Sequence, residues 1–311
     1  MPRRRPDIGG LEGVLIVNKP AGPTSHDVVA LVRRLSSTRR IGHGGTLDPF
    51  ASGVLPLFLG GATRLVEYHL GDRKGYRATV CFGSSSTTDD LQGELTPVDG
   101  PALDSESVTG ALAGFLGEIS QRPPPFSAIQ VGGRRAYAMA RAGTPLELPA
   151  RLVTIHALDL VAWNADDPGR PIAVLDVACS AGTYVRALAR DLGMRLGSAA
   201  YLGALIRTSS GPFGIADAVA LDDLRVAAAD GPGALVPFLK PSDAGLDHLA
   251  SIRLSTEEIR DAAMGRFVRP RSGLSGLTAG EPIRLVDDRD RIVGIGELDG
   301  ARIAPSKMIA G

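Results

Sequence analysis

Hydrophobic and polar positions alternate along this chain in short blocks that predict a mixture of helices and strands. The apolar run Gly13 to Asn18 predicts a strand that stops at Lys19-Pro20, and the apolar stripe after Ser25 predicts a helix. The same two periodicities predict strands at 76–82, 172–179, 282–286 and 292–298, an apolar run at 54–59, and helices at 108–116 and 184–196. Helices and strands alternate without an internal repeat, which predicts a mixed α/β fold.

Shifts in composition divide the chain into two predicted domains. A chain of 311 residues has room for one large and one small domain. We expect the large domain at 1–230, a linker that contains Pro and Gly at 231–249, and a small β-rich domain at 250–311. Within the large domain, residues 122–151 are rich in Pro, Gly and Arg, which predicts a protruding basic insertion.

Charge is segregated along the chain although the net charge is zero. Residues 1–77 hold 12 Lys or Arg against six Asp or Glu, and residues 122–151 hold five Arg against one Glu. Residues 78–121 hold seven acidic residues and no basic ones. A basic face of this kind would attract phosphate groups, although solvated surface charge explains the count equally well.

Several classes of protein are disfavoured by what the sequence lacks. No run approaches the roughly 20 apolar residues of a membrane span, and the arginine-rich start has no apolar signal segment. Cys81 and Cys179 form no CxxC pair, so we expect buried free thiols. We therefore expect a cytoplasmic protein.

The glycine-rich stretch Gly42 to Pro49 is the first candidate for chemistry. Glycines on both sides of His43 would let a thin loop project its imidazole, but the stretch matches no phosphate-binding loop. Taken alone, Asp48 before Pro49 reads as a helix cap, and His43 alone reads as a surface histidine.

The whole string from Gly42 to Leu57 changes this interpretation, because it resembles the GH(T/A)G(A/T)LDPxA(T/S)GxLP motif of the bacterial pseudouridine-55 synthase (TruB-type) family. The resemblance continues in register through residues 13 to about 214. Its further blocks are Gly13 to Ser25, Lys74-Gly75-Tyr76, Gly83 to Gly93, Pro124 to Gly143, and Cys179 to Arg186.

The resemblance implies a fold and a reaction. The fold would be a mixed α/β catalytic domain with a largely antiparallel central sheet, followed by a small PUA-like RNA-binding β-barrel. The reaction would convert uridine 55 of tRNA to pseudouridine without a cofactor or metal. Asp48 would be the catalytic carboxylate, Arg186 its cationic partner, and Tyr76 the aromatic that stacks on the uracil and takes part in proton transfer.

The resemblance also implies how RNA is bound. The target base must leave its loop, and His43 would occupy the space it vacates. Leu205 would close the base pocket, and the expected partner is the T stem-loop of tRNA, bound by a monomer. Further positions that match RNA- or substrate-binding residues are Lys19, Gly44, Asp90, Arg141 and Tyr184. Gln130 and Ile206 stand where the family often has cationic residues. We expect these two departures to affect the affinity for RNA and not the chemistry.

Two other functions fit parts of the sequence. An RNA-folding helper could grip the same stem-loop after losing catalysis, but such a protein has no need of a carboxylate that faces an anionic substrate. A hydrolase that uses Asp48 or a metal on the histidines is disfavoured, because the five histidines lack a ligand spacing such as HExxH.

Overall fold

The computed structural model describes residues 10–71, 73–124, 126, 130–131, 134–135, 148–270, 274 and 276–309. The chain forms two compact units. Unit 1 comprises Met1–Leu47, Leu55–Leu70 and Ala216–Gly311, and unit 2 comprises Asp48–Val54 and Gly71–Ile215. No helix among the described residues is both long and apolar enough to cross a membrane.

Unit 2 is built on a curved sheet whose neighbouring strands are antiparallel. The strand order is β12, β4, β11, β10 and β7. Their bounds are β4 Lys74–Phe82, β7 Gly117–Gln121, β10 Arg151–Asn164, β11 Ile172–Cys179 and β12 Ala200–Ser210. The start of β3 (Ser52–Leu59) pairs with β12 in parallel, so the sheet is mixed. The residues that alternate inward along β11, such as Leu175 and Val177, are buried as the sequence pattern predicts.

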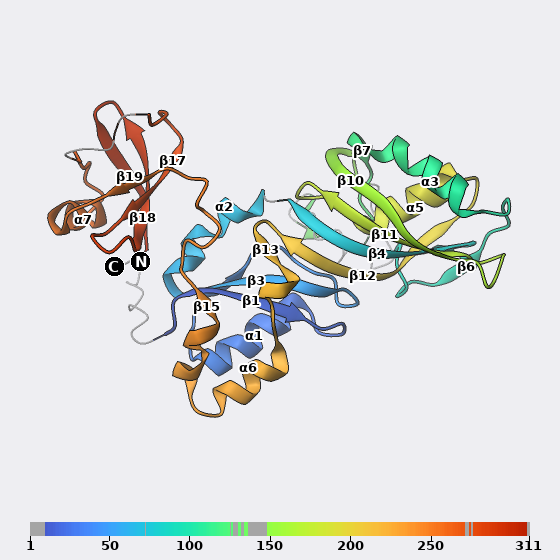
Figure 1. The fold of residues 1–311 in the computed structure, drawn as a ribbon, viewed down its shortest axis with the longest axis horizontal. Helices are drawn as coiled ribbons and strands as arrows, with labels where there is room; N and C mark the ends of the chain where they lie inside the picture. Colours follow the sequence, from blue (N-terminus) through green and yellow to red (C-terminus); the bar gives the residue numbers. More distant parts are fainter. Residues whose placement is uncertain are drawn as a thin grey trace. The chain divides into compact units, whose positions relative to one another are not determined.

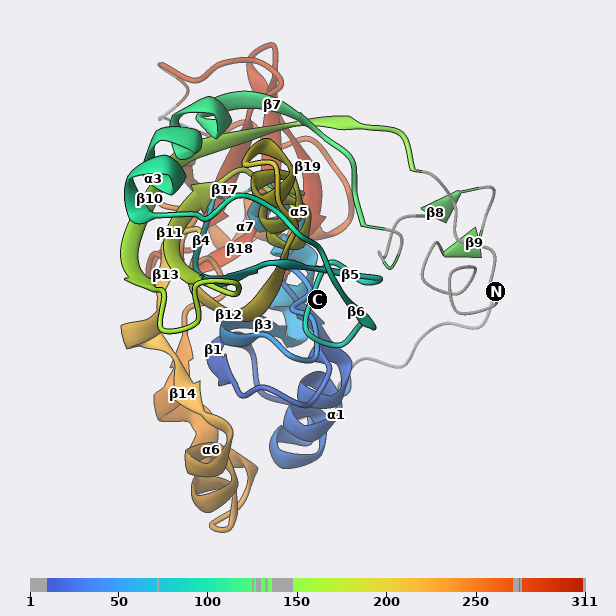
Figure 2. The same ribbon diagram turned by 90° about the vertical axis from the view of Figure 1, so that its right-hand side faces the viewer.

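Two helices pack on this sheet. Helix α5 (Val185–Arg195) packs against β12 and β4, and the strands curve around it (Figure 2). Helix α3 (Ser105–Leu112) packs against β10 and α5, and a 3-10 turn, η2 (Ala113–Phe115), continues it. The expected helix at 108–116 therefore begins earlier and ends in a tighter turn, because Asp104 and Ser107 form a capping box at its start.

Short strands complete unit 2. They are β5 Ser84–Ser86 with β6 Leu95–Pro97, β8 Gln130–Val131 with β9 Arg134–Arg135, and β13 Phe213–Gly214 on β12. The expected basic insertion falls mostly on residues outside the described part of the chain.

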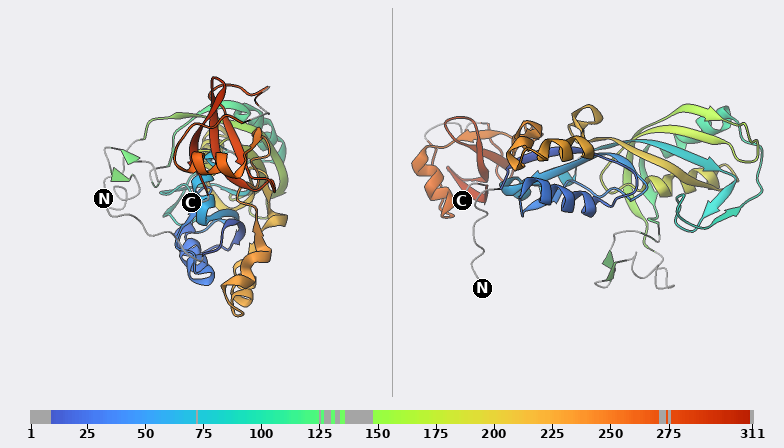
Figure 3. Two further views of the ribbon diagram at one scale, coloured as in Figure 1. Left: turned by 90° about the vertical axis from the view of Figure 1, so that its left-hand side faces the viewer. Right: turned by 90° about the horizontal axis from the view of Figure 1, so that it is seen from below.

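The first part of unit 1 is a small sheet with helices on it. Strand β1 (Gly13–Lys19) lies between β14 (Val219–Ala220) and β3 in the sheet order. Figure 3 shows α1 and α6 on one side of these strands. The other elements are α1 Ser25–Ser36, β2 Ile41–His43, η1 Gly60–Leu65, α2 Glu67–Leu70, η3 Ile215–Asp217, α6 Leu221–Ala228, η4 Pro232–Phe238 and β15 Leu239–Lys240, which pairs with β1.

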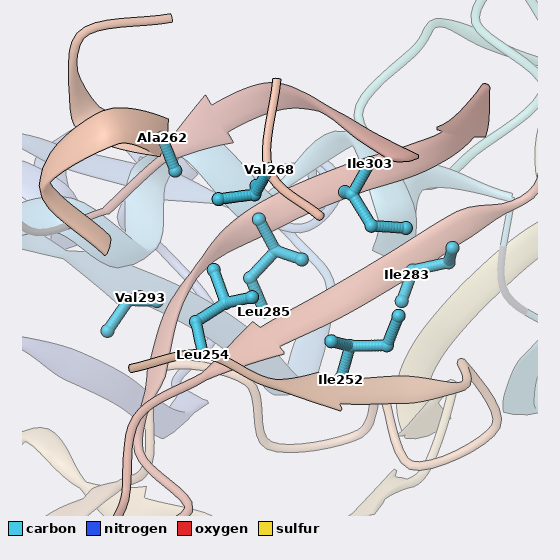
Figure 4. Packing of buried hydrophobic residues seen from close by; sticks show 8 residues of the cluster. All are labelled: Ile252, Leu254, Ala262, Val268, Ile283, Leu285, Val293 and Ile303. Atoms are coloured by element: carbon cyan, nitrogen blue, oxygen red, sulfur yellow. The ribbon is translucent and has the colours of Figure 1, made fainter. Parts of the chain in front are cut away.

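Four strands between Ser251 and Met308 form a sheet (Figure 1). Its order is β16 Ser251–Arg253, β17 Pro282–Val286, β18 Ile292–Asp299 and β19 Arg302–Met308, with α7 Thr256–Ala263 beside it. Figure 4 shows its apolar core, formed by Ile252, Leu254, Ala262, Val268, Ile283, Leu285, Val293 and Ile303. Among the described residues these strands form an open row, and strand pairing does not close them into the expected barrel.

Candidate functional site

An ion pair between Asp48 and Arg186 marks the candidate site in unit 2. Asp48 begins a turn in which the Ala51 N–H donates to its carbonyl, and Arg186 is the second residue of α5. The Asp48 Oδ2 atom lies 3.0 Å from Arg186 Nε. The Arg186 side chain is only 6% exposed, whereas that of Asp48 is 36% exposed. The buried Arg186 guanidinium therefore holds the Asp48 carboxylate in place, and the carboxylate stays accessible to an incoming molecule.

Asp90 supplies a second carboxylate to the same guanidinium. Its Oδ2 atom lies 3.2 Å from Arg186 Nη1, which also donates to the Thr88 carbonyl at 3.2 Å. The other oxygen, Oδ1, accepts from the Thr88 hydroxyl at 2.6 Å and from the Gln92 N–H at 2.9 Å. Asp90 was expected among the RNA-binding residues, and the structure places its carboxylate on Arg186. Two carboxyl groups therefore share one guanidinium in this cluster.

Tyr76 lies on β4 opposite Arg207 on β12. Burial raises the pKa of the Tyr76 hydroxyl, Arg207 counters this by charge and by a hydrogen bond to it, and the Asp48 carboxylate raises the pKa further. The Tyr76 phenol therefore keeps its proton at neutral pH. Burial in turn lowers the pKa of Arg207, whose Nε donates to the Val54 carbonyl at 2.6 Å.

Gly53 allows β3 to approach β12 at this point. Its φ of 104° lies in the region that favours glycine, and a Cβ atom there would collide with the Arg207 carbonyl oxygen. The turn that carries Asp48 leads into this close approach, so Gly53 helps to fix where the carboxylate is presented.

Tyr184 directly precedes α5, the helix that carries Arg186, and Leu205 lies on β12. Tyr184 caps the start of α5, where its backbone N–H donates to Gln121 Oε1 at 2.8 Å and its carbonyl accepts from Gln121 Nε2 at 3.1 Å. The Arg151 guanidinium lies over the Tyr184 ring, 4.7 Å from the centroid. Leu205 is buried on β12, next to the exposed Ile206. The Tyr184 backbone is therefore held rigidly where α5 begins.

Three expected RNA-binding residues lie in unit 1. The Lys19 ammonium is fully buried and donates to the carbonyls of Pro20 and Pro23 at 2.9 and 2.8 Å, which indicates that it stabilises this turn. His43 ends β2 opposite Leu57, and its ring packs edge-on against that of His26, with centroids 5.6 Å apart. Gly44 donates its N–H to the Pro56 carbonyl at 3.0 Å. Arg141, the remaining expected residue, lies outside the described residues.

Sequence reasoning missed one residue that contacts the cluster, Thr88, and two residues beside it. Thr88, Gln121 and Arg190 were not singled out, although the Gly83 to Gly93 block and the Arg186 helix contain two of them. The spacing of Arg186 and Arg190, four residues apart on one helix, was the available signal. In the described part of the chain, no three His, Cys, Asp or Glu residues group as a metal site would require.

Comparison with known proteins identifies the family. The TruB family pseudouridylate synthase N-terminal domain matches residues 33–185, and the tRNA pseudouridylate synthase B C-terminal domain matches residues 186–247. The tRNA pseudouridine synthase B of Synechococcus sp. (strain WH7803) is 44% identical over 96% of this chain and 97% of its own. The chain belongs to the TruB family of pseudouridylate synthases. As a TruB-family member it is an isomerase.

A second curated relative and two solved structures are also similar to this TruB-family chain. The tRNA pseudouridine synthase B of Thermobifida fusca (strain YX) is 42% identical over 96% of this chain and 99% of its own. Among solved structures, a chain of a Cbf5-Nop10-Gar1 complex has a TM-score of 0.71 at 26% identity, covering 98% of this chain and 88% of its own. A chain of an H/ACA RNP bound to a substrate RNA has a TM-score of 0.73 at 24% identity, covering 96% and 85%, and shares the fold.

Proposed function

We propose that this TruB-family chain converts uridine 55 in the T loop of tRNA to pseudouridine, with Asp48 as its catalytic carboxylate. The single observation that carries the proposal is the Asp48–Arg186 pair, in which a buried guanidinium holds a carboxylate that remains open to solvent. The relatives named above, at 42 to 44% identity, are tRNA pseudouridine synthases, which supports tRNA as the substrate.

The reaction breaks the N1–C1′ bond of the uridine and forms a C5–C1′ bond to the same uracil. The Asp48 carboxylate either attacks C1′ or assists removal of a ribose proton, and both routes require the ionised form beside the sugar. The uracil then turns in the site, C5 joins C1′, and the C5 proton leaves while N1 gains one. Atoms balance within the nucleotide, so the proposed reaction requires no cofactor or metal.

Tyr76 is proposed to stack on the turning uracil and to take part in the proton transfer. Its hydroxyl is protonated at neutral pH because burial raises its pKa, so the phenol is poised to donate a hydrogen bond to the base. Leu205 and Tyr184 are proposed to line the base pocket, and Asp90 is proposed to orient Arg186 through its contact with the guanidinium.

RNA recognition is proposed to involve residues outside the charged cluster. His43 would fill the space left by the extruded base, with stacking that recovers about 1–3 kcal/mol of the cost of base flipping. The glycine at 44 keeps the loop thin, Lys19 supports the adjoining turn from inside, and Arg141 would contact phosphate. The C-terminal sheet is proposed to be a PUA-like RNA-binding domain, and the chain to act on the T stem-loop as a cytoplasmic monomer.

The proposal is tested with unmodified tRNA transcripts incubated with the wild type or with Asp48→Asn, and with pseudouridine scored by position. We expect product at position 55 with the wild type, and a rate reduced by about 10⁴-fold or more with Asp48→Asn, as for other essential catalytic groups. Asp159→Asn, on exposed sheet surface, is the matched control and should retain the wild-type rate.

Two results would reject parts of the proposal. Product at position 55 from Asp48→Asn at the control rate would exclude the catalytic role of Asp48. Tight binding of tRNA by the wild type without any product would favour the RNA-folding helper instead.

A further inference from the structure

Helix α5 carries a second arginine, Arg190, that repeats the contacts of Arg186 one turn further along. Arg186 binds the Asp90 carboxylate at 3.2 Å and donates to the Phe126 carbonyl at 2.9 Å. Arg190 binds the Asp89 carboxylate at 2.7 Å and donates to the Arg122 carbonyl at 2.9 Å. Because residues four apart lie on one helix face, the two guanidinium groups hold the same two segments side by side.

The turn that carries the two carboxylates is suited to this double contact. Asp89 has a φ of 61°, which aspartate tolerates better than most side chains, and this bend directs two consecutive carboxylates to one helix. The turn is also fixed to β12, since the Leu202 N–H donates to the Asp89 carbonyl at 3.0 Å and the Leu91 N–H donates to the Leu202 carbonyl at 3.0 Å. Both Asp89 and Asp90 are buried.

Arg190 has contacts beyond those needed to neutralise Asp89. Its Nε and Nη2 atoms also approach the Asp191 carboxylate, at 2.9 and 2.8 Å. One planar guanidinium therefore joins α5, the Asp89 turn and the Arg122 backbone. A lysine could supply the charge but could not reproduce this fork of donors.

We propose that Arg190 is a positioning residue for the isomerisation, acting through Arg186. By fixing the Asp89 turn and the Arg122 backbone on the α5 face that carries Arg186, it sets where the Arg186 guanidinium meets Asp48. The inference rests on the proposed function, because it assigns to Arg190 the geometry of the Asp48–Arg186 pair. A displacement of about 1 Å in such a pair is enough to lower a rate by as much as about 100-fold.

The test compares Arg190→Gln and Arg190→Lys with the wild type in single turnovers at saturating tRNA transcript, together with the transcript Kd. Arg195→Gln is the matched control, because Arg195 is an exposed arginine of the same helix that lies 5.7 Å from the centroid of the Phe115 ring. Each rate is measured well below the Tm of that variant and is scaled to the folded fraction.

We expect Arg190→Gln to lower the single-turnover rate constant by about 10- to 100-fold while the Kd stays within about twofold, and Arg195→Gln to match the wild type. Arg190→Lys keeps a cation beside Asp89, so its Tm should be higher than that of Arg190→Gln. Its rate constant should nevertheless stay below that of the wild type. The lysine variant decides the question if Arg190→Gln does not fold.

A wild-type rate constant in folded Arg190→Gln, or full recovery of the rate constant by Arg190→Lys, would overturn the proposal. An equal loss in Arg195→Gln would also overturn it, since any change of charge on α5 would then suffice. A wild type that forms no pseudouridine would instead reject the proposed function, so the two failures are distinguishable.

Discussion

Two arginine–aspartate pairs of unit 2 have the same N–O distance, but the pKa values of their aspartates are shifted in opposite directions. Asp89 lies 2.7 Å from Arg190, and Asp176 on β11 lies 2.7 Å from Arg77 on β4. Burial raises the pKa of Asp89 by more than Arg190 lowers it, whereas the hydrogen bond from Arg77 lowers the pKa of the exposed Asp176. Access to water, not the length of the ion pair, decides which effect is larger.

The candidate site contains a buried arginine, Arg186, and this burial distinguishes it from the exposed Arg77–Asp176 pair. The Arg77–Asp176 pair makes two short hydrogen bonds, at 2.8 and 2.7 Å, but its side chains are 51% and 40% exposed, so solvent and salt screen the pair. Arg186 has longer contacts, yet it is fixed by its surroundings and its charge is little screened. Fixed charge at a defined point is what a developing charge on a sugar requires.

The largest effect should come from removing the buried cation, as in Arg186→Met. The Asp90 carboxylate would remain buried without this counterion, so we expect a loss of about 3–5 kcal/mol in the free energy of unfolding together with loss of pseudouridine formation. Urea denaturation at pH 7 measures the first and the transcript assay the second. Arg77→Met is the exposed control, and an equal loss in both variants would show that burial of the arginine does not determine the size of the effect.

A cavity on the same strand as Asp176 should cost almost as much stability without affecting the chemistry. Leu175 is 1% exposed, so Leu175→Ala should lower the free energy of unfolding by about 2–5 kcal/mol. The single-turnover rate constant of the folded variant should stay near that of the wild type. A rate constant that fell in proportion to stability would mean that the loss of activity in Arg186→Met does not by itself indicate a role in the chemistry.

The pH dependence of stability should have opposite signs for the two aspartates. Asp89 has a raised folded-state pKa, so its stabilisation is present below the ordinary value of 3.8 and is lost as pH rises through the folded pKa. Asp176 has a lowered one, so its stabilisation is present above 3.8 and is lost as pH falls through the folded pKa.

Urea midpoints of Asp89→Asn and Asp176→Asn, measured against the wild type over an acidic to neutral series, test these signs. The advantage of the wild type over Asp89→Asn should shrink as pH rises above 3.8, and its advantage over Asp176→Asn should shrink as pH falls below 3.8. Parallel trends in the two variants would refute the assigned effect of burial.

The smallest effect is expected from Asp176→Asn at pH 7. An exposed ion pair contributes roughly 0.2–1 kcal/mol, and added salt should reduce even that. The same urea measurements at low and high salt check this. A loss as large as that of Leu175→Ala would mean that the pair is not screened as its exposure implies.

Local sequence pattern predicted the elements whose periodicity is uninterrupted. The helix expected at 184–196 is α5, Val185–Arg195, and the strand expected at 76–82 is β4, Lys74–Phe82. The long strand β10 was not predicted, because register shifts at Ile155/Ala157 and Leu160/Ala162 interrupt its alternation. The C-terminal strands at 282–286 and 292–298 were predicted almost residue for residue.

Only the site residues that lie within family motifs could be predicted from the sequence. The resemblance named Asp48 and Arg186, and the structure brings them within 3.0 Å, but their catalytic roles stay predictions. The contact of Asp90 with Arg186 spans 96 positions and depends on how the Asp89 turn docks on β12. No local pattern encodes such a contact, since it arises from the packing of α5 against the sheet.

Gly53 has a practical consequence for anyone who maps this chain by random mutagenesis. Every side chain larger than hydrogen would strike the Arg207 backbone, so an activity screen should discard substitutions at position 53 as strictly as those at position 48. A map of intolerant positions would then score a residue with no reactive group as though it took part in the reaction. Pairing each activity score with the amount of folded protein would separate the two kinds of intolerance.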